Sequence, residues 1–146
     1  MLEADIVVAG MGPGVAGTGT PFGTSGLDLA EIVNASIALD GRPIVALRMS
    51  GTDPRDRHRG VSHHVRTALT RLVPDPGRVT VPVPSEVLDA AGQALPGFGV
   101  VSCDDGDALE LLRDEPVAHM GRGLDADPLF FRCAGAAGAH AAALDR

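Results

Sequence analysis

Arginine and histidine are concentrated between residues 48 and 66, in the stretch RMSGTDPRDRHRGVSHHVR. The whole chain contains no lysine, so arginine supplies every cationic side chain. Guanidinium groups donate paired hydrogen bonds to phosphate or carboxylate. We therefore expect this segment to bind a small anion, through Arg48, Arg55, Arg57, His58 and Arg59. The alternative is a solvated charged loop in which Asp53 and Asp56 pair with some of the arginines.

His63 and His64 fall in the first turn of a predicted helix, whose positive end disfavours imidazolium. As neutral imidazoles they are candidates for a general acid or base, which makes an enzyme the second hypothesis. A metal site made of these two with His58 and an aspartate is a weaker alternative. The spacing matches no zinc signature and the nearby arginines repel a cation, so we expect no metal ligands.

Glycine makes up seven of the seventeen residues between positions 10 and 26, GMGPGVAGTGTPFGTSG. Glycine lets backbone amides approach an anion, and hydroxyls add donors. The candidate ligand-binding residues of this loop are Gly12, Gly14, Gly17, Thr18, Thr20 and Ser25. A dinucleotide site is disfavoured because the helix does not open inside the glycine motif and no acidic residue follows the second strand. A purely structural loop remains open, and no cofactor is assigned.

These loops require a scaffold, and the apolar pattern predicts alternating strands and helices. Predicted strands cover residues 5–9, 43–48, 78–83, 99–102 and 117–120. Predicted helices cover residues 27–39 (with Ser25 as its N-cap), 61–72 and 108–113, and a last helix begins at Asp125 or Asp127. This order predicts one α/β domain over residues 1–146, a Rossmann-like three-layer α/β/α sandwich with a mainly parallel sheet. In such sheets ligands bind beyond the carboxyl ends of strands, so the two loops should form one cleft.

Composition narrows the function classes. The formal net charge of −7 argues against nucleic-acid binding, and no apolar run is long enough to cross a membrane. No secretory signal is recognisable, so we expect a cytoplasmic protein in which Cys103 and Cys133 are reduced. The last predicted helix is rich in alanine and glycine, which favours close packing in the core or in a homodimer. A structural or oligomerisation module is therefore the third hypothesis.

Three stretches of the sequence are distinctive: GMGPGVAGTGTPFGTSGL, RPIVALRMS followed by DPRDRHRGVSHHV, and HMGRGLDADPLFF. With them the chain resembles a bacterial family known as domain of unknown function 3866. The family has no established activity and so assigns no catalytic residue. Its members are expected to be longer, which implies that this chain is the carboxy-terminal part of a larger protein and contacts the remainder of it.

Overall fold

The central β structure is parallel and is built from three short apolar segments. In the computed structural model, which describes residues 4–11 and 16–144, β3 (Thr80–Val83) pairs in parallel with β4 (Gly99–Ser102). An isolated parallel bridge joins Ile44 to Thr80 at the other edge of β3. There the Val45 N–H donates to the Thr80 carbonyl at 2.9 Å, and the Thr80 N–H donates to the Pro43 carbonyl at 3.0 Å. β3 is therefore central.

The chain continues from this edge segment into a small hairpin. β1 (Met49–Ser50) pairs antiparallel with β2 (Gly60–Val61), and the loop between them holds the single 3₁₀ turn η2 (Asp56–His58). Gly60 has a φ of +70°, a conformation that glycine adopts without steric cost. Because Met49 is buried in the core, the arginine- and histidine-rich loop starts from a fixed point.

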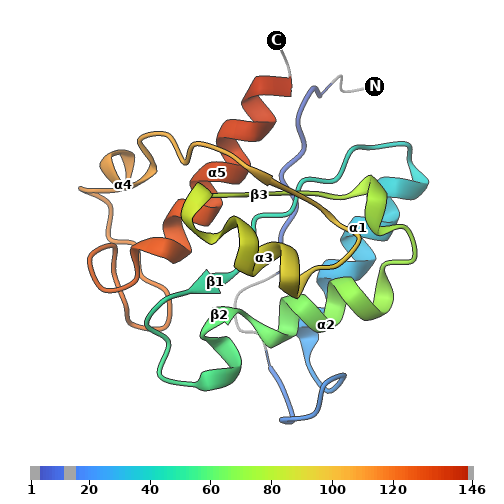
Figure 1. Ribbon diagram of the computed structural model, residues 1–146, viewed down its shortest axis with the longest axis horizontal. Helices are drawn as coiled ribbons and strands as arrows, with labels where there is room; N and C mark the ends of the chain where they lie inside the picture. The colour runs from blue at the N-terminus through green and yellow to red at the C-terminus, as the bar shows by residue number, and fades with distance from the viewer. Residues whose placement is uncertain (1–3, 12–15, 145–146) are drawn as a thin grey trace.

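In the described part of the chain, five α-helices surround these strands: α1 (Asp28–Ala38), α2 (His63–Leu72), α3 (Leu88–Ala94), α4 (Ala108–Leu111) and α5 (Pro128–Leu144). Three further 3₁₀ turns are η1 (Ser25–Leu27), η3 (Pro76–Arg78) and η4 (Ser85–Val87). Figure 1 shows β3 crossing the middle of the molecule, with α5 toward the left and α1 and α2 toward the right. α5 packs on β3 and β1, α3 packs on β4, and α1 packs on α2. None of the described helices is both long and apolar enough to cross a bilayer.

The hydrophobic core forms where these elements meet. Its largest completely buried apolar side chains include Leu47 beside β3, Leu69 on α2, Val81 within β3 and Leu95 after α3. The alternating burial of residues 43–49 shows that one face of the segment meets the core and the other faces outward. Burial of this core is the main favourable term that holds the β1–β2 hairpin in place.

The prediction of an α/β domain is confirmed only in its coarse form. The described residues form a mixture of helices and small sheets, one two-stranded parallel and one two-stranded antiparallel. The predicted strands at 78–83 and 99–102 correspond to β3 and β4, and the predicted strand at 43–48 contributes one bridge. The mainly parallel sheet of a three-layer sandwich is not present among them.

Two predicted strands are wrong. Residues 5–9 have no strand partner among the described residues, and Val7 and Val8 are 78% and 94% exposed. Their apolar side chains are therefore not buried against the core, as a buried strand would require. Residues 117–120 instead enter a tight turn, in which His119 bridges Arg122 and Met120 takes a φ of +52°. The structure therefore does not place a strand directly before the glycine-rich loop.

The predicted helices are confirmed more fully than the predicted strands. α1, α2 and α4 fall within the ranges predicted for them, and α5 begins at Pro128 as its fixed φ favours. α3 was not predicted. The prediction of Ser25 as N-cap is wrong: Leu27 precedes α1 without a side-chain cap, and Thr24 caps the turn η1, where its hydroxyl accepts a hydrogen bond from the Gly26 N–H. Gly135 of α5 packs closely within the chain, since a Cβ on it would collide with residues just before and within α4.

Candidate functional site

The β1–β2 loop folds around a buried carboxylate. Asp53 is completely buried and accepts hydrogen bonds from Arg55 Nε at 2.9 Å and from Arg55 Nη2 at 2.8 Å. Arg122, which follows the turn at Met120, donates through Nη2 at 2.9 Å. The Arg55 hydrogen bonds hold the pKa of Asp53 well below its usual range, against the opposing effect of burial. Asp53 is therefore ionised and fully paired.

A second buried carboxylate connects this loop to α5. Asp127 is completely buried and accepts hydrogen bonds from the Ser50 hydroxyl at 2.5 Å, the Gly51 N–H at 3.2 Å and Arg122 Nε at 3.1 Å. Arg122 thus bridges Asp53 and Asp127, and these two acids, Arg55, Arg122 and Ser50 are called the buried ion network below. The network joins residues more than seventy positions apart in the sequence and fixes the base of the loop.

Two of the predicted anion-binding arginines are used inside the loop. Arg55 is committed to Asp53, and Arg59 pairs with Asp56 at 3.6 Å while its Nε donates to the Asp53 carbonyl at 3.4 Å. For these two residues the geometry agrees with the alternative of a charged loop that pairs its own acids and bases. Arg55 and Arg59 therefore have structural partners already.

Arg48 is different, because it lies partly buried at the end of the edge segment without a carboxylate of its own. Its Nη2 lies 3.2 Å from His119 Nε2, and no acid lies within ion-pair distance of it among the described residues. Burial, and then the charge of Arg55, lower the pKa of Arg48, while Asp53 opposes them. His119 stacks on Phe130 with ring centroids 3.9 Å apart. Arg48 is thus held in place but not neutralised.

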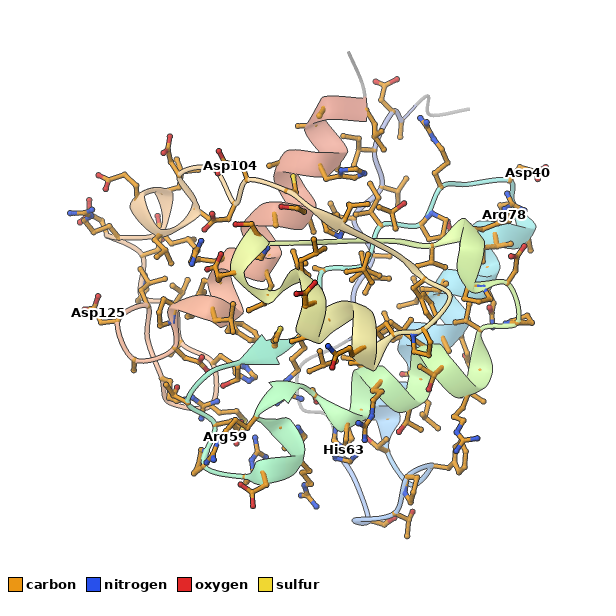
Figure 2. All side chains as sticks on the ribbon, in the orientation of Figure 1. Asp40, Arg59, His63, Arg78, Asp104 and Asp125 are labelled. Atoms are coloured by element: carbon orange, nitrogen blue, oxygen red, sulfur yellow. The ribbon has the colours of Figure 1, made fainter. Side chains whose placement is uncertain are left out.

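Three histidines converge beside Arg48. His58 on η2 is only 2% exposed, and His63 and His64 occupy the first turn of α2. The ring centroids of His63 and His64 are 4.0 Å apart, and the ring centroid of His58 lies 4.9 Å from that of His63 and 5.0 Å from that of His64. One ring nitrogen of each residue lies within 4.8 Å of the others. Figure 2 shows His63 at the amino end of α2 and Arg59 on the neighbouring hairpin loop.

Hydrogen bonding leaves part of this cluster unsatisfied. His58 Nδ1 lies 2.9 Å from the Ser62 hydroxyl, which therefore does not cap α2 as its position would suggest. His63 Nε2 and His64 Nδ1 are buried, and neither has a hydrogen-bond partner among the described residues. Buried polar atoms of this kind are uncommon in folded proteins and indicate strain or an interaction with a bound group. Ser62 was not among the predicted site residues.

Electrostatics keep these imidazoles uncharged. Burial, followed by the positive charges of Arg55 and Arg48, lowers the pKa of His58 to about 4. The pKa of His63 is lowered by burial first and by the charge of Arg57 second. The pKa of His64 is lowered by burial first and by its neighbour His63 second. At neutral pH each ring therefore carries one N–H and one free lone pair.

The glycine-rich loop contributes less than expected. Gly12 and Gly14 lie outside the described residues. Gly17 bridges Thr24, the Thr18 and Thr20 hydroxyls bond to each other and to Gly23, and Ser25 Oγ accepts a hydrogen bond from the Ala16 N–H. These polar groups stabilise the loop itself. Its end is still close to the histidines, because η1 packs against α2.

Other parts of the described chain offer less chemistry. Cys103 and Cys133 are free thiols, and burial raises the pKa of Cys133 to about 12, so it is not a nucleophile. Two surface hollows, one beside α3 and one between α4 and the start of α5, contain none of the predicted site residues. The histidines and Arg48 are therefore the strongest candidate site.

Comparison with known proteins gives one match. A protein-family model described as "Protein of unknown function (DUF3866)" matches residues 1–138. The match spans nearly the whole of the chain. No curated protein and no solved structure matches the chain.

Proposed function

The chain belongs to the DUF3866 family of proteins of unknown function, and we propose that it binds a small anion carrying a phosphate or carboxylate group. The proposed site is the basic cluster, defined as Arg48, Arg57, His58, His63 and His64. The proposal rests mainly on Arg48. Its guanidinium is partly buried and forms no ion pair with a carboxylate among the described residues, so the hydration that it loses on burial is not fully replaced. An anion would supply that compensation.

The surroundings of Arg48 add donors rather than acceptors. Arg57 is exposed on η2 and has no ion pair among the described residues, and its charge acts on both His63 and His64. Each neutral imidazole presents an N–H to a ligand. A guanidinium and an imidazole N–H on one surface recognise a phosphate or carboxylate by charge and by hydrogen bonding.

The amino end of α2 supports the same ligand. The first amides of a helix have no partner within the helix, and the Ser62 hydroxyl is engaged by His58 and caps none of them. The helix dipole places partial positive charge at this end. α2 therefore adds backbone donors to the side chains of the basic cluster.

Calorimetric titration with inorganic phosphate and with malonate tests the proposal, on protein treated with chelator so that no metal contributes. We expect saturable binding that weakens as salt rises. Arg48→Gln and Arg57→Gln should each weaken it, while Arg71→Gln, at an exposed position on the last turn of α2, should leave it unchanged. Absence of binding, or equal loss in all three variants, would contradict the proposal.

An enzyme that uses His63 or His64 as general base is the second candidate. The unpaired ring nitrogens and the lowered pKa values favour it, because a neutral imidazole at pH 7 can accept a proton. Turnover of a phosphate or carboxylate ester that disappears in His63→Ala or His64→Ala but survives in His140→Ala would support it. Binding of the product anion without turnover would favour binding alone.

A further inference from the structure

The convergence of three imidazoles has a consequence beyond anion binding. We propose that His58, His63 and His64 together bind one transition-metal ion of the zinc class. Imidazole nitrogen is a preferred ligand of such ions, and three histidines form a known donor set for zinc with one open position. The proposal is independent of the proposed anion binding, since each can occur without the other.

The geometry is close to what a metal ion requires. One nitrogen from each ring lies within 4.8 Å of the other two. A tetrahedral zinc ion, with nitrogen ligands at about 2.1 Å, places those nitrogens about 3.4 Å apart. The residues His63 and His64 are only partly buried, so their rings are less confined than that of His58. The hairpin loop and the helix already hold the three residues in one place.

The Ser62 hydroxyl provides the support that metal-binding histidines usually have. A ligating imidazole commonly uses its second nitrogen in a hydrogen bond that fixes the ring and its tautomer. His58 Nδ1 has this contact with Ser62 at 2.9 Å, which leaves Nε2 as its free nitrogen. Ser62 is itself buried, so the contact is shielded from solvent. Ser62 therefore acts as a positioning residue for His58.

The unsatisfied nitrogens are an independent observation in favour of a bound ion. His63 Nε2 and His64 Nδ1 are buried and find no partner among the described residues. An uncompensated buried polar atom destabilises the folded state, because it loses its hydrogen bonds to water without replacement. Coordination would remove that cost for a nitrogen that becomes a ligand. The spacing of these histidines in the sequence did not indicate a metal site. In the structure η2 and β2 turn the chain back and bring His58 to the other two.

The surrounding charges determine which further ligand the ion would bind besides the three histidines. Asp53 is saturated by arginines and Asp56 is exposed, so neither carboxylate is part of the donor set. Arg48 and Arg57 oppose a bare cation, but they favour a hydroxide or another anion at its open position. This last step alone rests on the proposed function, and it predicts that a bound anion tightens metal binding.

Metal titration of the untagged full chain tests the inference, in a buffer free of phosphate and carboxylates. Chelator-treated protein is titrated with Zn²⁺ in competition with a chromophoric chelator, and with Co²⁺ to record its visible absorption. We expect one ion per chain, a tetrahedral Co²⁺ spectrum and a higher melting temperature with Zn²⁺. His63→Ala and His64→Ala should each weaken binding by more than about 100-fold, since loss of outer-shell partners alone costs 10–100-fold.

His140→Ala, on α5 outside the cluster, is the matched control and should bind like the wild type. Circular dichroism of each variant shows that lost binding is not lost folding; if a variant unfolds, His63→Gln and His64→Gln replace it. The inference is overturned if the wild type binds no stoichiometric ion, or if folded His63 and His64 variants bind as tightly as the wild type. Because this titration contains no anionic ligand and the anion titration contains no metal, the two proposals fail separately.

Discussion

Arg122 is the residue on which the buried ion network depends most. It is only 16% exposed and donates to two completely buried carboxylates, to Asp53 at 2.9 Å and to Asp127 at 3.1 Å. In Arg122→Leu, Asp53 keeps Arg55, but Asp127 retains only the hydrogen bonds of Ser50 and Gly51 and loses its cation. Breaking a buried pair by removing one partner costs about 3–5 kcal/mol. We expect a loss of free energy of unfolding in that range.

Urea unfolding followed by circular dichroism measures this loss, and the melting temperature should fall by about 10 °C for a chain of this size. Arg113→Leu is the matched control, because Arg113 and Glu110 form an exposed pair on α4 and its C-terminal flank. Such surface pairs contribute only about 0–1 kcal/mol. The comparison separates removal of an arginine in general from removal of this one.

The double variant Arg122→Leu/Asp127→Asn tests the cause. If the cost arises from an unpaired buried charge, then neutralising Asp127 in the Arg122→Leu background should recover part of the stability. A loss in Arg122→Leu no larger than that in Arg113→Leu would refute the reasoning. So would a double variant whose loss equals the sum of the two single losses, because that would mean that the two side chains do not interact.

Three further predictions follow from the structure. Gly135→Ala should destabilise the fold by about 1–3 kcal/mol, because its Cβ would lie 2.6 Å from the Asp105 carbonyl oxygen, whereas Gly138→Ala, with open space around it, should be neutral or slightly stabilising in thermal unfolding. In metal-free protein the free energy of unfolding should fall by about 3 kcal/mol as the pH drops from 6.5 to 4. The reason is that His58 in the unfolded chain binds a proton in this range, whereas the folded residue, with a pKa of about 4, does not. His58→Gln should flatten this dependence of stability on pH. Ser62→Ala should weaken Zn²⁺ binding about 10–100-fold without changing its stoichiometry, as measured by chelator competition; unchanged affinity would show that Ser62 does not position His58.

Local sequence signals identified most helices but fewer strands. α2 and α5 have apolar or small residues at helical spacing, and Pro128 marks the start of α5, so their positions follow from local chemistry. Residues 5–9 are as apolar as a strand, yet they are exposed and pair with no other segment among the described residues. Burial and pairing depend on the rest of the fold, so no local pattern shows this.

The candidate site divides in the same way. The density of arginine and histidine between residues 48 and 66 drew attention to this loop, and three of its histidines lie together in the structure. It did not show which arginines are already paired, because Arg55 and Arg57 have the same side chain and adjacent acids. Burial of Asp53 decides between them. That burial depends on Arg122, which is distant in sequence.

The sequence by itself determined the chemistry that is available: no lysine, a net charge of −7, and cationic and imidazole groups concentrated in one loop. These properties follow from residue types and need no fold. Only the tertiary structure decided how that chemistry is divided, because hydrogen bonds and burial depend on distance in space. Arg122 pairs with Asp53 of the loop, and Asp127 binds the base of the loop at Ser50 and Gly51. η2 brings His58 to His63 and His64, and Arg48 has no acid within ion-pair distance among the described residues. A sequence records the spacing of these residues but not the turns that bring them together.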